Sequence, residues 1–309
     1  MIGVLTNGIP DACRFDGPIR ISARGMADYV DIANTKFTVD VSGRGMGYGK
    51  LVSDECSFKV QVVGLSNFVE NVQGRICGGH FRGSGLVAAP AGTSSDAVYR
   101  VEGSVEDVEL KALVAALAGA SEDYRGRVSG SISLGGVLGT NAVSRAHGEG
   151  TVAVRDGQIF RLPLFGGLTY YLTRFVPGLN FVVAQSDAKS SFLIGDGKIH
   201  TGEVLVEGDV LSLRGRGEYA FDRSLDFKVQ VRLLKHKTVA GKIVQFLTSP
   251  ISKFFEFRLR GTLDKPRWYV RTFSKDLLVQ LGLRKKPVPE AVETEEFVPV
   301  EALVQEVAP

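Results

Sequence analysis

The side chains best suited to catalysis or metal binding are scattered along this sequence. Asp156 and Asp196 could form a carboxylate pair, but each is followed by glycine, and Asp-Gly is the favoured two-residue hairpin turn. Neither an HExxH motif nor a carboxylate at ligand spacing accompanies the four histidines. These four are His80, His147, His200 and His236. The pattern predicts turns and isolated solvated histidines, with no catalytic residue, no metal site and no cofactor.

Two glycine-rich segments resemble ligand-binding loops only superficially. Gly43-Arg44-Gly45-Met46-Gly47 lacks the Gly-Lys-Ser/Thr ending of a phosphate loop and does not open a helix, so it predicts a strand of small residues. The Arg-Gly-Arg-Gly segment at 214–217 could suggest RNA binding, but it lies within strict β alternation, unlike a disordered, repeated RGG segment. We therefore expect a protein that is not an enzyme and has no nucleic-acid partner.

The longest regular pattern runs from Leu211 to Leu233. Large apolar residues occupy most odd positions and polar residues the even ones, which is typical of extended strands with one apolar face. The segment 221–225 predicts a turn, so the two arms form a hairpin that presents apolar side chains on one side. Each such side chain costs about 1.5–3 kcal/mol if it is left in water. The candidate lining residues of an apolar groove are Leu211, Leu213, Tyr219, Phe221, Leu225, Phe227, Val229 and Val231.

The apolar face of the 211–233 hairpin could be covered in two ways. The side chains could line a trough that holds lipid acyl chains, or they could pack on amphipathic helices of the same chain. Apolar residues at helical spacing predict such helices near 105–118, 163–176 and 238–256. The sequence leaves both coverings open.

Composition favours a mainly β protein. Glycine makes up 37 of 309 residues, about 12% against a usual 7% or so, without a period of three. The predicted fold is a long, twisted or curled antiparallel sheet, open and groove-like, with two or three amphipathic helices. The pentapeptide Phe-Lys-Val-Gln-Val occurs at 58–62 and again at 227–231, each time after an Arg/Gly-rich arm, which indicates two copies of one hairpin unit.

Charge is unevenly distributed. The whole chain carries +3 and residues 287–309 contribute six Glu and no Lys, Arg or Asp, so the remaining residues carry +9. A basic body favours anionic partners or simply a solvated, Lys- and Arg-rich sheet face. We interpret 1–64 as an N-terminal β segment that continues the same sheet, 65–273 as the main β-groove region, and 274–309 as a short helix with a disordered acidic tail.

Neither cysteine content nor hydropathy fixes the compartment. Cys13, Cys56 and Cys77 are odd in number and widely spaced, which predicts buried small side chains and leaves their redox state open. No apolar run reaches the roughly 18–20 residues of a membrane span, and the first 30 residues do not look like a signal peptide. The sequence thus predicts either a cytoplasmic protein or a chain whose targeting segment is missing.

A series of degenerate motifs resembles a known family. In order these are Gly-rich strands at 126–136 and 148–159, Leu162-Pro163-Leu164 with the helix after it, strands around Asp196-Gly197, the 211–233 hairpin, and Phe257 to Pro266. Together they resemble the C-terminal region of the AsmA-like proteins, the bacterial envelope group that includes TamB and YhdP. The resemblance covers roughly residues 65–273.

This resemblance implies a function that composition alone does not. Members of the AsmA-like group are usually anchored in the inner membrane and cross the periplasm as a curled sheet with an apolar trough. They are implicated in phospholipid traffic and outer-membrane assembly. We accordingly expect a periplasmic, membrane-associated protein of the cell envelope that binds phospholipid acyl chains, with envelope proteins of either membrane as partners. The family's anchor is expected to be absent from this chain, which suggests a C-terminal piece, a split gene or a misplaced start. The main alternative is a scaffold module with a closed core and no lipid cargo; an outer-membrane barrel and a carbohydrate-acting β-solenoid fit the sequence less well.

Overall fold

The computed structural model describes residues 13–28, 30–48, 50–89, 97–119, 124–139, 142–175, 186–209, 211–233 and 254–272. In this part of the chain the protein is mainly β, its strands pair antiparallel, and it contains two α-helices. The chain divides into two compact units. The N-terminal unit comprises Met1–Arg155 with Leu193–Gly197, and the C-terminal unit comprises Asp156–Phe192 with Lys198–Pro309.

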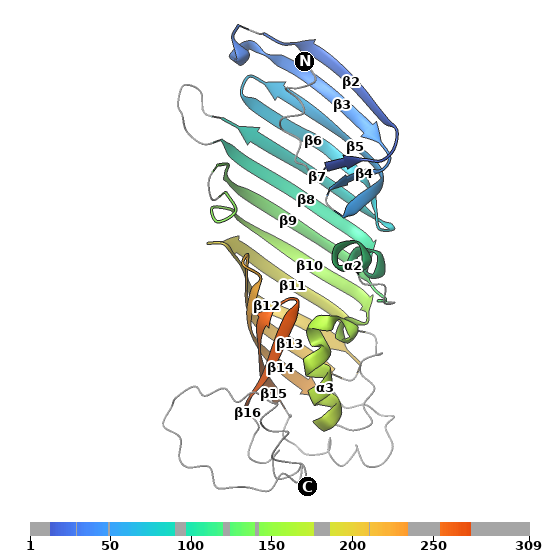
Figure 1. The fold of residues 1–309 in the computed structure, drawn as a ribbon, viewed down its shortest axis with the longest axis vertical. Coiled ribbons are helices and arrows are strands. Elements are labelled where there is room, and N and C mark those ends of the chain that lie inside the picture. Colours follow the sequence, from blue (N-terminus) through green and yellow to red (C-terminus); the bar gives the residue numbers. More distant parts are fainter. Residues whose placement is uncertain are drawn as a thin grey trace. The chain divides into compact units, whose positions relative to one another are not determined.

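The N-terminal unit is an antiparallel meander with a branched start (Figure 1). Strands β5 to β10 pair in chain order, β5 also pairs with β3 and β4, and β2 and β1 complete these two branches. A 3₁₀ helix, η1 (Ile32–Asn34), joins β2 to β3, and α2 (Leu110–Ala118) follows β8 directly. The strands are β1 (Cys13–Phe15), β2 (Ile19–Met26), β3 (Lys36–Gly43), β4 (Met46–Tyr48), β5 (Leu51–Val63), β6 (Ser66–Ile76), β7 (Gly79–Ala88), β8 (Val98–Glu109), β9 (Arg127–Val137) and β10 (His147–Gly157).

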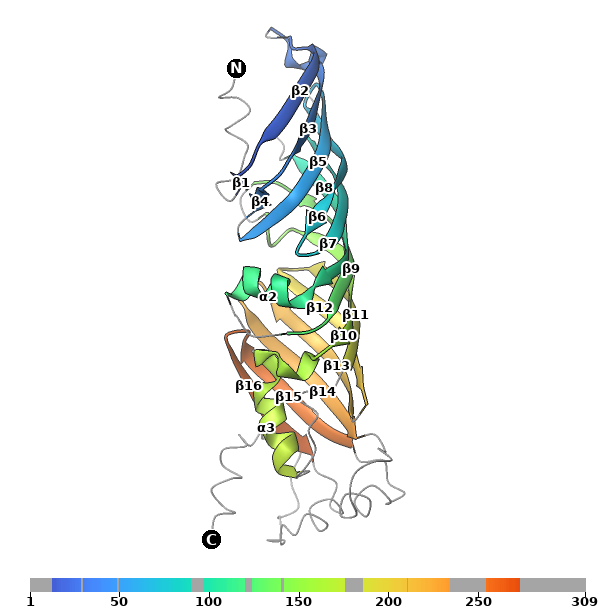
Figure 2. The same ribbon diagram turned by 90° about the vertical axis from the view of Figure 1, so that its right-hand side faces the viewer.

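The C-terminal unit begins with helices and ends with strands. Two 3₁₀ helices, η2 (Ile159–Arg161) and η3 (Pro163–Phe165), lead into α3 (Gly166–Phe175). The strands that follow pair in chain order. They are β11 (Ser186–Gly195), of which residues 193–195 belong to the N-terminal unit, β12 (Lys198–Gly208), β13 (Leu211–Ala220), β14 (Ser224–Leu233), β15 (Phe254–Thr262) and β16 (Lys265–Thr272). In both views α3 lies alongside the strands of this unit (Figures 1 and 2).

Several local predictions are confirmed. The hairpin forms from β13 and β14, with Leu213 opposite Val231 and Tyr219 opposite Leu225. Asp196 and Gly197 both have positive φ (52° and 71°), as a two-residue hairpin turn requires. The helix expected near 163–176 is present as η3 and α3.

Two local predictions are wrong, and a β-bulge explains the first. Residues 105–109 extend β8 rather than starting a helix. The register of β8 shifts between Val105 and Val108. A bulge places residues three apart on the same face of a strand, which mimics helical spacing. The second is Asp156-Gly157, which ends β10 ahead of η2 and forms no tight hairpin.

The predicted helix near 238–256 is corrected where it can be assessed. Residues 254–256 begin β15, in which Phe255, Phe257 and Leu259 alternate with charged residues. This period of two is typical of a strand. The helical spacing of the apolar residues before 254 therefore does not continue into 254–256. Residues 238–253 and the predicted short helix and tail at 274–309 lie outside the described residues.

Candidate functional site

The predicted groove residues lie together on one face of the β13–β14 hairpin. Five of them are almost completely buried: Leu211, Leu213, Leu225, Val229 and Val231 are 1, 2, 7, 4 and 0% exposed. Tyr219, Phe221 and Phe227 are half-buried, and Phe221 lies in the turn between the strands. The structure therefore brings seven of the eight onto neighbouring strands.

The apolar row continues from the hairpin into the next two strands. Val231 is opposite Phe255, and Val229 is opposite Phe257, which in turn is opposite Val270. Phe255 and Phe257 are 0 and 1% exposed, and their rings stack with centroids 6.4 Å apart. Four strands thus share one buried apolar face.

Helix α3 packs on the β15–β16 part of this face. Leu168 and Leu172 are completely buried, one turn apart on the helix. The indole Nε1 of Trp268 on β16 donates a 2.9 Å hydrogen bond to the carbonyl oxygen of Leu164, and its ring lies 6.2 Å from that of Phe165. The backbone approaches closely, since a Cβ built on Gly167 would be 2.8 Å from Trp268 Cδ1. The protein's own side chains therefore pack against one another here.

A second apolar face, in the N-terminal unit, is considerably more open. Strand register aligns Ile21 with Val41 and Phe58, and further along the meander aligns Val101 with Leu134. Because side chains alternate along a strand, all of these lie on one face. We call this set the open apolar face; its members are Ile21, Val39, Val41, Phe58, Val60, Val69, Val101, Val105, Ile132, Leu134 and Val152.

Exposure distinguishes the open apolar face from the C-terminal one. Ile21, Val101, Val105, Ile132 and Val152 are 65, 43, 36, 37 and 39% exposed. The remaining members are half-buried. Val108 and Val128, opposite one another on β8 and β9, are more deeply buried, at 2 and 7% exposed.

Glycines make part of the open apolar face smooth. Gly85 and Gly103 take positions on it beside Val101 and Ile132. A Cβ built on Gly103 would have its nearest neighbours, Arg82 O and Ile132 Cγ2, 3.8 Å away. This is ordinary contact distance, so neither packing nor backbone conformation requires glycine there, and the missing side chain leaves a shallow space.

Sequence reasoning missed this face because its signal is divided among many short strands. The only long, uninterrupted alternation in the sequence was the 211–233 hairpin, and it drew the prediction to the C-terminal unit. The second copy of Phe-Lys-Val-Gln-Val, at 58–62, was the available signal for the N-terminal face.

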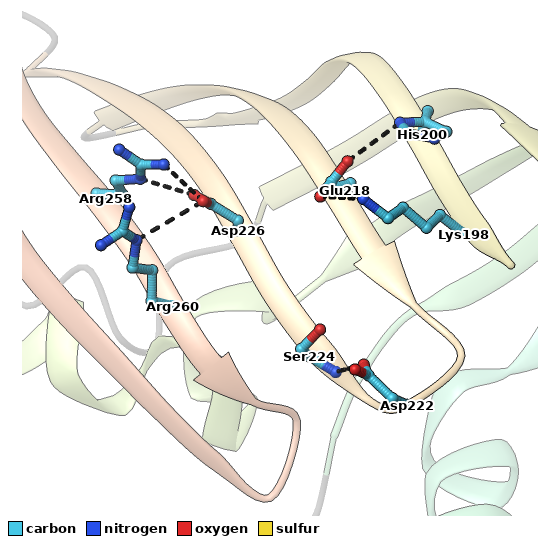
Figure 3. A network of polar contacts seen from close by, with 8 residues as sticks. All are labelled: Lys198, His200, Glu218, Asp222, Ser224, Asp226, Arg258 and Arg260. Carbon is cyan, nitrogen blue, oxygen red and sulfur yellow. Dashed lines mark hydrogen bonds and ion pairs between the residues drawn. The ribbon is translucent and has the colours of Figure 1, made fainter. Parts of the chain in front are cut away.

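The titratable residues do not assemble into a metal-binding group within the described ranges. No cluster of three or more His, Cys, Asp or Glu side chains lies at metal-binding distance there. His200 Nδ1 lies 3.5 Å from Glu218, a carboxylate that also accepts a 2.9 Å hydrogen bond from Lys198 (Figure 3). Cys56 and Cys77 are free thiols, and burial raises the pKa of each.

The polar face of the C-terminal unit carries ion pairs. Arg258 donates hydrogen bonds from Nε and Nη2 to the two carboxylate oxygens of Asp226, at 2.7 and 2.5 Å (Figure 3). These bonds, and the charges of Arg258, Arg260 and Lys228, lower the pKa of Asp226 although partial burial opposes them. Asp222 caps the following turn by accepting from the Ser224 N–H, and its pKa is likewise lowered by hydrogen bonds from Ser224. These contacts hold β15 against β14 and order the turn between β13 and β14.

No protein-family model, curated protein or solved structure matches this chain. In the described part of the chain, neither α-helix has the length and hydrophobicity needed to cross a membrane.

Proposed function

We propose that this protein is a non-enzymatic protein of the bacterial cell envelope that shields phospholipid acyl chains on its open apolar face. In this role it supports phospholipid transport between the inner and outer membranes, or outer-membrane assembly. The observation that carries the proposal is the row of valine and isoleucine side chains that stay 36–65% exposed across β2 and β8–β10. The order of motifs shared with AsmA-like proteins supports the same function.

The energetics are adequate without any catalytic residue. An acyl chain of sixteen carbons costs about 12 kcal/mol in water, at about 0.8 kcal/mol per methylene. Contact with the open apolar face removes part of this cost for the lipid. The same contact covers the exposed apolar side chains of that face, which is also favourable. We therefore propose the N-terminal unit as the acyl-chain site in place of the β13–β14 hairpin, where five of the eight predicted lining residues are buried.

The closed core of the C-terminal unit favours a second candidate function. A face filled by Phe255, Phe257 and Trp268 has the packing of a scaffold or docking module. On this alternative the protein carries no lipid and presents its sheet to other envelope proteins.

Lipid analysis of the purified protein separates these two functions. We expect phospholipid to co-purify with the full chain and to be detected by mass spectrometry. A Val101→Asp/Ile132→Asp double variant should lose this lipid while keeping its fold, because both side chains are already more than one third exposed. Ser104→Asp, between Gly103 and Val105 but on the opposite face, is the control and should keep the lipid.

A second variant adds apolar bulk instead of charge. Gly103→Leu should fill the shallow space beside Ile132, keep the fold and lower the bound lipid. Absence of lipid from the wild-type protein, or equal lipid in all four proteins, would support the scaffold function instead.

A further inference from the structure

The polar face of the N-terminal unit contains a depression of about 540 Å³. Its rim carries Arg44, Arg75, Arg82 and His80, and Ser57 and Gln73 lie between them. These residues belong to β5, β6, β7 and the turn after β3, so four segments contribute to one site. This volume is within the range of about 300–1,000 Å³ that is typical of small-molecule sites.

Strand register holds the cationic groups together. Arg75 is directly opposite His80, and Gln73 is directly opposite Arg82. Directly opposed residues on antiparallel strands have Cβ atoms about 4.5–5.5 Å apart and diagonal ones about 7–8 Å, so Arg75 and Arg82 can reach one ligand. The two arginines are on paired strands, which fixes their spacing more firmly than a loop would.

Some arginines of the described residues form ion pairs with carboxylates, and others, including those of the depression, do not. Arg127, Arg155, Arg214, Arg223 and Arg258 each form an ion pair with Asp or Glu. Arg44, Arg75 and Arg82 form none with the described residues, although Glu55 lines the same depression opposite Arg75. Glu55 is thus the one carboxylate that lines the depression with these three guanidinium groups, and Glu106 is opposite His80 on the next strand.

We propose that this depression binds a phosphate-bearing ligand. The planar guanidinium fork matches the oxygens of phosphate in a bidentate way, and the Ser57 hydroxyl and the Gln73 amide add neutral donors. A second depression of about 240 Å³ shares Ser57 and Gln73 and adds Arg20, Lys59 and the carboxylate Asp40, so further cationic side chains lie beside the first depression. The site lies on the face opposite to the open apolar face, and it does not depend on acyl-chain binding.

The phosphate group could belong to a soluble phosphomonoester or to a lipid headgroup, and two probes distinguish these sources. Glycerol 3-phosphate is titrated into the full-length protein by isothermal titration calorimetry. Sedimentation with phosphatidylcholine vesicles that contain phosphatidic acid tests the headgroup. Binding of the first probe identifies a soluble ligand, and binding of the vesicles alone identifies a headgroup.

Variants show whether the depression itself is responsible. Arg75→Gln/Arg82→Gln should weaken binding about tenfold or more, because the phosphate loses two charge-assisted hydrogen-bond donors. Arg24→Gln/Arg100→Gln removes the same charge from the same face outside both depressions and should leave binding unchanged. Glu55→Gln should tighten binding, since it removes a carboxylate from the rim. This variant also tests the proposal if the arginine variants fail to fold.

The proposal is overturned if neither probe binds, or if the Arg24/Arg100 pair weakens binding as much as the Arg75/Arg82 pair. The latter result would show a diffusely positive surface. Loss of phosphate binding in the Arg75/Arg82 variant should leave the co-purified acyl lipid unaffected. Failure of the phosphate-site proposal can therefore be distinguished from failure of the proposed acyl-chain function.

Discussion

The same five residues, Phe-Lys-Val-Gln-Val, occur once in each unit and have different surroundings. In β5 the copy at 58–62 is half-buried throughout. In β14 the second and third apolar residues, Val229 and Val231, are 4 and 0% exposed. Both copies pair antiparallel on both sides and direct their apolar residues to one face. The difference arises from large neighbours such as Phe255 and Phe257, and it teaches that alternation predicts an apolar face but not whether the protein fills it.

The largest contrast should come from placing a charge on each face. Val231→Asp introduces an unpaired carboxylate into a completely buried position, and we expect it to lower the free energy of unfolding by about 3–5 kcal/mol or to prevent folding. Ile132→Asp, at a position 37% exposed, should cost about 1 kcal/mol or less. Urea unfolding followed by circular dichroism measures both. Equal losses would mean that the two faces are packed alike.

A second comparison truncates equivalent valines of the two pentapeptides, with a smaller expected loss of stability. Val229→Ala should lower the free energy of unfolding by about 2 kcal/mol because it leaves a cavity in the core. Val60→Ala, the same change in the same local sequence, should cost about half as much, since the valine is only half-buried. The comparison fails if Val60→Ala is the more damaging of the two.

Two adjacent glycines test the contact between α3 and β16. Gly167→Ala should destabilise the protein by about 1 kcal/mol, because the new Cβ would clash with the Trp268 ring, which its own contacts hold in place. Gly166→Ala should be neutral or stabilising by up to about 1 kcal/mol, because a Cβ there meets nothing within 4 Å and alanine favours the helix. Thermal unfolding of the two variants gives the comparison. Stabilisation by both would show that α3 does not approach Trp268 this closely.

The smallest expected effect concerns pH. The pKa of Asp226 is lowered in the folded protein, so its pairing with Arg258 stabilises the fold above about pH 4 and stops doing so as pH falls through the folded-state pKa. Asp226→Asn should therefore cost about 1 kcal/mol or less at pH 7, since the carboxylate is partly solvated, and almost nothing near pH 2. Urea unfolding at both pH values measures this. If Asp226→Asn lowered the free energy of unfolding equally at both pH values, the loss would come from changed packing and not from the missing charge.

Local patterns in the sequence were enough for much of the fold. Alternation predicts the β13–β14 hairpin, Asp196-Gly197 predicts the turn between β11 and β12, and the Leu164–Leu172 spacing predicts α3. The prediction of a helix from residue 105 onward was wrong because of a β-bulge. Its extra residue places the side chains of Val105 and Val108 on the same face of β8.

The covering of each face could not be predicted, because it depends on contacts distant in sequence. Trp268 binds the carbonyl of Leu164, 104 residues earlier, and no local signal links them. The arginines of the depression could not be grouped from the sequence either, because Arg44, Arg75 and Arg82 come together only through the pairing of β3, β5, β6 and β7.

Thiol protection measures the openness of the two faces most directly. In a protein with Cys13, Cys56 and Cys77 replaced by serine, a single cysteine is placed at Val101 or at Val231, and its rate of maleimide labelling is followed with and without phospholipid. We predict that Val101→Cys labels rapidly in the lipid-free protein and slowly once lipid is bound, whereas Val231→Cys labels slowly in both. Slow labelling of Val101→Cys without lipid, or a rate that lipid does not change, would contradict an open apolar face that holds acyl chains.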